Sequence, residues 1–367
     1  MVRTLFSGVM VAGCLTMLAG SVPAAELPGF TTGEVKLQSA GPLAFTPDGF
    51  LLVGDPKAAK VLALDVGQEK RGDAQLQIAN LNEALAKATG ANAANITVVD
   101  LKVQPETGAV YLSVNAGGPA IVRIGGPDAV SKVELDKISH ASTELVDAPE
   151  DKIVGEGRRA GNRRLESITD LAFHEGQVIV TGLSSKDAPS TVRSIAFPFT
   201  DSSIATPIEI FHAAHGRDED YAVVRAFVPF TIGGEPHLLA GFTCTPLVKF
   251  PLGALSKSES KVRGTTIAEL GNRNRPLDMI VYSQDGKEYV LMSNTARGVM
   301  KISTEDIERE EGLTQRVEGG GTAGQQFETI TGWDNVVQLA KLSPNTAVVI
   351  TQADAGSGMQ LKSVPLP

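Results

Sequence analysis

Residues 278–302 read DMIVYSQDGKEYVLMSNTARGVMKI. The segments 278–282, 289–294 and 298–302 are rich in alternating apolar side chains, and Asp285-Gly286 separates the first two. Alternation over a few residues predicts a β-strand, and Asp-Gly between two such runs is typical of a tight turn. The stretch therefore predicts three consecutive antiparallel strands.

The same order of strand, turn, strand, loop and strand recurs along the chain. Its copies are 53 to 70 residues apart and begin at Pro42, Asp100, Asp170, Arg225, Asp278 and Gln338. Further strand candidates lie between the copies, at residues 74–78, 132–135, 207–211, 265–270 and 326–330. Four strands per unit is the composition of a propeller blade.

These units predict an all-β fold, a six-bladed β-propeller with four-stranded antiparallel blades. The last unit lacks a fourth strand, whereas residues 33–39 form a strand candidate outside any unit. Because closing the ring removes exposed sheet edges, we expect this N-terminal strand to complete the last blade. Residues 26–367 then form a single propeller domain.

Two segments interrupt the repeat. Residues 80–95 are rich in Ala and carry apolar side chains at helical spacing, which predicts a short helix on the rim. Residues 139–167 are polar and read as a long loop inserted into the propeller, with four arginines close together: Arg158, Arg159, Arg163 and Arg164. Loops of this length are usually functional or disordered. Both a lid over one mouth of the channel and a solvated loop fit the sequence.

The first 25 residues have the three regions of a secretory signal peptide. A positive start at Arg3 is followed by an apolar run over 5–18 and by small residues up to Ala25. We therefore expect removal of residues 1–25 and location in the periplasm or outside the cell, with no transmembrane segment left. Residues 11–14, Val-Ala-Gly-Cys, also resemble a lipoprotein cleavage site, which would leave a lipid anchor on Cys14.

Composition excludes several classes of protein. The net charge of −9 argues against a general nucleic-acid binder, which needs a basic face. The two cysteines rule out a disulfide scaffold, and no spacing of a zinc finger or a c-type haem site occurs. His212 and His215 are near enough for a metal on a turn, but no third His is nearby in sequence, so we expect surface histidines. For Cys244, a buried apolar residue and a nucleophile with a neighbouring base both stay open.

Residues 43–65 and 275–294 resemble blades of the NHL-repeat and gluconolactonase-like propellers. The shared pattern is a strand, a turn with Asp-Gly, a second strand and a closing Asp or Asn. The resemblance implies the propeller fold. For some members it implies a calcium-dependent lactonase or esterase, with Glu, Asn and Asp holding the metal at the top of the central channel, whereas other members only bind. Leu277-Asp278 stands here where the family usually has Asn-Gly.

Polar side chains recur at the start of the innermost strands, namely Asp100, Asp170 and Asp278, with Arg225 at the same place in the fourth unit. Because equivalent positions of a ring converge on its axis, we expect these four residues to form a ligand site. The three aspartates, with Asn115 and Asn294 at the ends of second strands, would supply the oxygen ligands that Ca²⁺ prefers. The alternatives are a polar plug across the channel and carboxylates that only cap turns.

The repeat units resemble one another in their pattern, but the sequence shows no closely spaced set of catalytic residues. We therefore expect a monomeric exported propeller that binds a small molecule or a periplasmic protein without catalysis. The alternative is a Ca²⁺-dependent hydrolase of lactones or esters, in which the channel metal polarises a carbonyl and a carboxylate activates water. Glu166, four residues before Asp170, is a further candidate ligand or general base.

Overall fold

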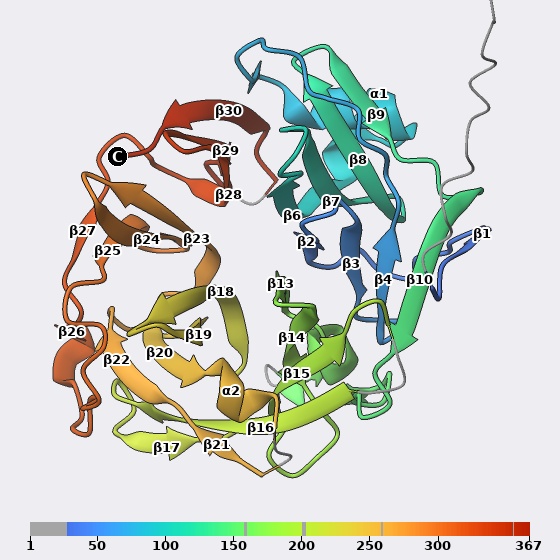
Figure 1. Ribbon diagram of the computed structural model, residues 1–367. Coiled ribbons are helices and arrows are strands. Elements are labelled where there is room, and N and C mark those ends of the chain that lie inside the picture. Colours follow the sequence, from blue (N-terminus) through green and yellow to red (C-terminus); the bar gives the residue numbers. More distant parts are fainter. Residues whose placement is uncertain (1–27, 158–159, 200–202, 258–259, 355) are drawn as a thin grey trace, which may run out of the picture.

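The strand units recognised in the sequence form six blades around a common axis in the computed structural model (Figure 1). The structure describes residues 28–157, 160–199, 203–257, 260–354 and 356–367. The predicted signal peptide over 1–25, together with Cys14, Arg158 and Arg159, lies outside the described residues. The expected all-β six-bladed propeller is confirmed.

Each blade runs from an innermost strand on the axis to an outer strand on the circumference, and we name the blades by the chain order of their innermost strands. From inside to outside, blade A contains β2 (Leu43–Phe45), β3 (Leu51–Asp55), β4 (Lys60–Leu64), β10 (Ile138–Glu144) and β1 (Thr31–Gly33). Blade B contains β6 (Ile96–Val103), β7 (Val110–Ala116), β8 (Pro119–Gly126) and β9 (Ala129–Lys132). Blade C contains β13 (Asp170–His174), β14 (Gln177–Leu183), β15 (Ser190–Ala196), β16 (Ser203–His212) and β17 (Arg217–Glu219).

The other three blades have the same plan. Blade D contains β18 (Val224–Ile232), β19 (Glu235–Phe242), β20 (Pro246–Pro251), β22 (Thr265–Glu269) and β26 (Ala323–Gly324). Blade E contains β23 (Pro276–Gln284), β24 (Lys287–Asn294), β25 (Gly298–Ser303) and β27 (Phe327–Thr329). Blade F contains β28 (Val336–Ser343), β29 (Thr346–Gln352), β30 (Met359–Pro365) and β5 (Gln77–Ile78). Outside this plan, β21 (Val262–Arg263) pairs in parallel with β16, and the helix α2 (Leu252–Leu255) follows β20.

The blades do not follow one another around the ring in chain order. The core of the described residues consists of six apolar clusters, and each joins two blades: A with B, A with C, C with D, D with E, E with F, and F with B. Blade A therefore lies between B and C, and the order around the axis is B, A, C, D, E, F (Figure 1). The chain starts in blade A, builds blade B on one side of it, and then continues with blade C on its other side.

The strand that closes the ring differs from the expected one. β5 pairs with β30 as the outermost strand of blade F, with Ile78 opposite Leu361. Residues 33–39 remain at blade A, where β1 pairs with β10 and the N–H of Val35 donates to the carbonyl of Leu135 at 2.8 Å. An early segment does complete the last blade, but the prediction is wrong about which one. Short alternating segments carry the same apolar pattern, and only the free blade edges decide where each one pairs.

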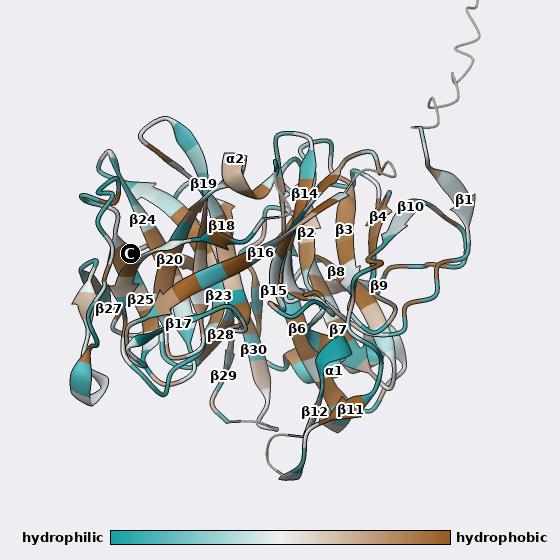
Figure 2. Cartoon of the chain, turned by 90° about the horizontal axis from the view of Figure 1, so that it is seen from below, coloured by the Kyte–Doolittle hydropathy of each residue, from teal (hydrophilic) through white to brown (hydrophobic). Residues whose placement is uncertain are grey.

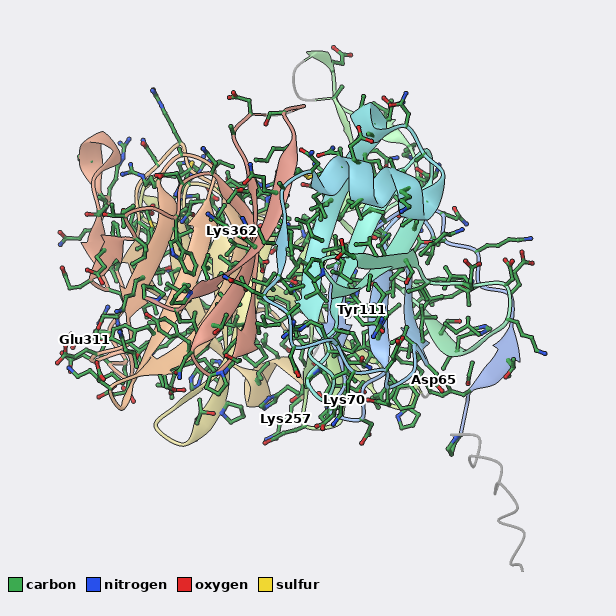
Figure 3. The ribbon with its side chains drawn as sticks, turned by 90° about the horizontal axis from the view of Figure 1, so that it is seen from above. Asp65, Lys70, Tyr111, Lys257, Glu311 and Lys362 are labelled. Atoms are coloured by element: carbon green, nitrogen blue, oxygen red, sulfur yellow. The ribbon has the colours of Figure 1, made fainter. Side chains whose placement is uncertain are left out.

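The helix expected within residues 80–95 is confirmed. α1 (Leu81–Thr89) buries Leu81 and Leu85 completely in the cluster between blades F and B. The helix ends at Gly90, which has a φ of 75° and donates its N–H to the carbonyl of Ala86, as is typical of a C-terminal cap. In Figure 3, α1 lies toward one face of the ring, and Asp65, Lys70 and Lys257 lie toward the other.

The loop expected over residues 139–167 begins as a strand. Residues 139–144 belong to β10, the fourth strand of blade A, so the prediction of a loop is wrong there. The polar sequence does not indicate a strand here because β10 is an outer strand. It buries only Ile138 and Ala141 and turns its polar residues to solvent. Farther along, β11 (Ile153–Val154) and β12 (Gly161–Asn162) form a hairpin that protrudes on the face that carries α1 (Figure 2). A 3₁₀ turn, Arg163–Glu166, follows it. Within the described part of the chain, no helix is long and apolar enough to cross a membrane.

Candidate functional site

A cavity of about 510 Å³ opens at the mouth of the central channel, where the innermost strands begin. All six blades contribute to its lining, through Pro42 of A, Asp100 of B, Asp170 of C, Arg225 of D, Asp278 of E and Gln338 of F. Leu165 and Glu166 of the 3₁₀ turn also line it. The end of the polar insertion therefore borders the mouth.

The three predicted aspartates join neighbouring innermost strands. Each carboxylate accepts the N–H of its own next residue through Oδ1, at 2.7–2.8 Å. Each Oδ2 accepts a backbone N–H from the next blade around the ring, and the three donors are Leu43 to Asp100 at 2.7 Å, Phe227 to Asp170 at 2.8 Å and Leu339 to Asp278 at 3.0 Å. These carboxylates therefore join blade B to A, C to D, and E to F.

The aspartates alternate around the axis. In chain order they occupy the second, third and fifth units, which shows no regularity. Because blade A lies between B and C, the ring order makes them the first, third and fifth. The mouth therefore has approximate threefold symmetry, with one carboxylate for every two blades.

Lys102 is the charged partner of the aspartates, and its place beside them was not predicted from the sequence. Its Nζ lies 3.0 Å from Oδ1 of Asp100 and 3.6 Å from Oδ1 of Asp278. Burial lowers the pKa of Lys102, but the carboxylates of Asp100, Asp278 and Asp170 outweigh this effect and raise it above its ordinary value. The signal was present in the sequence, since side chains two apart in a strand share a face. Lys102 follows Asp100 by two positions and so faces the channel.

Two of the carboxyl groups are held partly protonated near neutral pH. Burial raises the pKa of Asp170 to about 7, against the opposing effect of Lys102. Burial raises the pKa of Asp278 in the same way, to about 6. These carboxyl groups at the floor of the cavity can accept hydrogen bonds. Because its pKa is about 7, Asp170 can also take up or release a proton in the physiological range.

Arg225 does not occupy the position equivalent to the aspartates. A β-bulge between Val224 and Ala226 shifts the register of β18, so Ala226 takes that position and Arg225 is the extra residue. The bulge directs its guanidinium to the rim, where it donates to Oε1 of Glu166 at 2.8 Å and to Oγ1 of Thr243 at 3.1 Å. Arg225 and the three aspartates line one cavity, as expected, but Arg225 does so from the bulge.

Two other lining residues offer free hydrogen-bonding groups. Arg275 is exposed, and its guanidinium has no hydrogen bond or ion pair with any described residue. Gln338 donates through Nε2 to the carbonyl of Val99, whereas its buried Oε1 has no partner among the described residues. The mouth thus offers one unpaired cation and one unpaired acceptor.

Of the five predicted calcium ligands, the three aspartates meet at the cavity and the two asparagines lie elsewhere. Asn115 is exposed at the end of β7, and Asn294 is buried against Asn274, to which it is hydrogen-bonded; neither lines the cavity. The aspartate oxygens already accept backbone N–H groups, and the ammonium of Lys102 lies beside two of the carboxylates. This donor set does not fit the oxygen cage that Ca²⁺ takes. Calcium binding stays a prediction from the sequence.

Comparisons with known proteins bear on the fold. No family model and no curated protein sequence matches the chain. Among solved structures, the chain is similar to the PQQ-bound aldose sugar dehydrogenase of Streptomyces coelicolor, at 11% identity over 93% of this chain and 100% of that one, with a TM-score of 0.34. The major allergen Mala s 1 of Malassezia sympodialis matches at 8% identity over 92% and 96%, with a TM-score of 0.38. The plexin A4 extracellular region matches at 11% identity over 93% of this chain and 40% of that one, with a TM-score of 0.43. These similarities carry no argument about function, and the NHL-like resemblance is not specifically confirmed.

Proposed function

We propose that the protein is an exported propeller that binds a small polar ligand at the mouth of its channel. The observation that carries this proposal is the cavity to which all six blades contribute, with an unpaired guanidinium on its rim and carboxylates at its floor. Concave sites with a few convergent polar groups are the usual form of small-molecule sites. Export rests on the pattern of the first 25 residues.

The lining indicates the chemistry of the ligand. Arg275 can pair with a carboxylate or phosphate, because a guanidinium presents donors in a planar fork. Asp170, Asp278 and Oε1 of Gln338 can accept hydrogen bonds from hydroxyl or amino groups on the other end of the ligand. None of the described residues that line the cavity is aromatic, so a planar ring would find no stacking partner among them. We therefore propose an aliphatic anion that carries hydroxyl or amino groups.

Calorimetry and thermal shift on the mature chain test this proposal. The probes are aliphatic sugar acids, hydroxy acids and amino acids, with aromatic carboxylates of similar size as the comparison. We expect saturable binding of an aliphatic anion that is lost in Arg275→Ala. Arg273→Ala is the matched control, because Arg273 is exposed in the same loop but does not line the cavity. Equal binding of aromatic and aliphatic anions, or binding that survives Arg275→Ala, would contradict the proposal.

A second candidate function is hydrolysis of a lactone or ester. It is favoured by the position of Asp170, a carboxyl group that lines the cavity and whose pKa burial raises to about 7. A carboxylate with that pKa could act as general base toward water, while Arg275 stabilises the developing oxyanion. Turnover of lactones that falls in Asp170→Asn and is insensitive to chelators would support this reaction. If the protein binds a ligand tightly but turns over no lactone or ester, the result supports the binding function and contradicts hydrolysis.

A further inference from the structure

A second cluster of functional groups lies outside the channel cavity, where blades C and D meet. His212, His215 and Cys244 each direct one ligand atom there, and these atoms all lie within 4.8 Å of one another. Within the described part of the chain, this is the one group of three or more His, Cys, Asp or Glu residues whose ligand atoms are arranged so that they could hold a metal ion. The expectation of surface histidines is wrong for His212, which is only 2% exposed.

The two histidines lie on a tight turn between β16 and β17. The N–H groups of His215 and Gly216 both donate to the carbonyl of His212, at 3.0 and 2.8 Å. Gly216 has a φ of 67°, a conformation that side chains rarely adopt, and so lets the chain reverse here. The carboxylate of the buried Glu269 accepts the N–H of Ala214 at 3.0 Å and holds the turn against blade D.

Glu219 fixes the orientation of both imidazoles. Its Oε2 lies 2.8 Å from Nδ1 of His212, and its Oε1 lies 2.7 Å from Nδ1 of His215. In each contact the Nδ1–H group of the imidazole donates to a carboxylate oxygen, so a neutral imidazole carries its lone pair on Nε2. A carboxylate behind the distal nitrogen is the arrangement that metal-binding histidines use.

Nε2 of His212 is the atom that this arrangement leaves unexplained. It is buried and has no hydrogen-bond partner among the described residues. Buried polar atoms are nearly always paired, so an unpaired nitrogen on a side chain that is itself almost fully buried points to a missing ligand. Cys244 supplies the third ligand atom, from the turn between β19 and β20.

The turn that carries Cys244 is held in a strained conformation. Cys244 and Thr245 are consecutive non-glycine residues with φ of 65° and 56°. The N–H of Cys244 donates to the carbonyl of Asn274 at 2.7 Å, and Oγ1 of Thr245 donates to the carbonyl of Gly271 at 2.5 Å. Strain of this kind persists where surrounding contacts fix it, and it is frequent at functional sites. Cys244 is a free thiol.

We propose that His212, His215 and Cys244 bind a transition-metal ion, with Glu219 as the residue that positions both imidazoles. Two imidazoles and a thiolate suit Zn²⁺ and copper and do not suit the hard cations Ca²⁺ and Mg²⁺. Three protein ligands leave a fourth position for water or an added ligand, and the side chain of His215 is 41% exposed. A Cys–His nucleophile pair needs one imidazole, whereas here two are directed to the same place by one carboxylate.

Metal titration of the full mature chain, prepared without a histidine tag and stripped with a chelator, tests the proposal. We expect uptake of one equivalent of Zn²⁺, and with Co²⁺ or Cu²⁺ a thiolate-to-metal charge-transfer band. Cys244→Ser should abolish that band, and His215→Gln and Glu219→Gln should each weaken Zn²⁺ binding by about tenfold or more. The matched control is His140→Gln, since the ring of His140 bonds only a carbonyl of its own strand.

Alkylation of Cys244 by iodoacetamide distinguishes a thiol that binds a metal ion from the thiol of a nucleophile pair. A metal ion should slow alkylation of the stripped protein, and His215→Gln should remove that protection. Rapid alkylation that Zn²⁺ does not change would overturn the proposal in favour of a nucleophile pair. A charge-transfer band that persists in Cys244→Ser, or uptake that His140→Gln lowers equally, would also overturn it. Circular dichroism of each variant identifies loss of fold. Because Cys244 lies in a partly exposed turn, Cys244→Ser tests the proposal without a substitution at a buried residue.

Discussion

The carboxylate of Asp100 accepts the backbone N–H of Leu43 at 2.7 Å, although Leu43 belongs to the strand unit before it in the chain. The corresponding bonds of Asp170 and Asp278 reach forward in the chain, to Phe227 and Leu339. All three point the same way around the axis because blade A follows blade B in the ring. The aspartates therefore join the six blades as three pairs, and this role in stability is separate from any contact with a ligand.

Asp100→Ala should destabilise the fold by removing one of these links. It leaves the N–H groups of Leu43 and Leu101 buried without an acceptor, and each unpaired buried group costs about 1–3 kcal/mol. Urea denaturation followed by circular dichroism measures the change. Asp73→Ala, at an exposed position, is the control and should have no measurable effect. Equal stability of the two variants would mean that the carboxylate of Asp100 does not join the blades.

Asp170→Asn should remove part of the pH dependence of stability. The pKa of Asp170 is about 7 in the folded protein, against about 3.9 for an unfolded Asp. The folded state thus binds more protons between these values, so its stability falls as pH rises from about 4 to 7, by up to about 1.4 kcal/mol per pH unit. Asn imitates the protonated carboxyl and abolishes this contribution.

The difference between the two proteins is the quantity to measure, because the pKa of Glu269 is also raised to about 7 by burial and acts in the same direction. Urea midpoints of the wild type and Asp170→Asn, taken in half-unit steps of pH, give that difference. Parallel curves across this range would show that Asp170 is ionised in the folded protein.

Lys102→Met should destabilise the protein at neutral pH more than at acidic pH. Without the ammonium, the carboxylates of Asp100 and Asp278 face each other uncompensated, which costs on the order of 2 kcal/mol for a partly buried pair. Below about pH 5 the carboxyl of Asp278, whose pKa is about 6, is protonated and the loss shrinks. Carboxyl carbon NMR should also show the pKa of Asp278 rising. Lys60→Met removes an exposed ion pair with Glu144 and should change little at either pH.

The sequence predicts the parts of this protein better than their arrangement. Alternation and turn residues predict the three inner strands of every blade because these depend on local pattern. The order of the blades and the partner of β5 depend on packing and pairing between segments far apart in the sequence. The sequence revealed the three aspartates because each stands at the same position of its strand unit, namely Asp100, Asp170 and Asp278. His215 and Cys244 could not be paired, since they belong to different blades and meet only through packing.

A disulfide between β5 and β30 should show directly how the ring closes. Gln77 and Lys362 are opposite each other in an antiparallel pair, a separation that a disulfide can span. In a Cys244→Ser background, Gln77→Cys with Lys362→Cys should oxidise spontaneously and stabilise the fold by about 2–4 kcal/mol. Peptide mapping without reductant detects the link, and the thermal midpoint with and without reductant gives the gain. The control pair is Lys36→Cys with Lys362→Cys, because residue 36 lies in the segment first expected to close the ring. Linkage in the control pair and none in the first would place residues 33–39 at blade F and refute closure by β5.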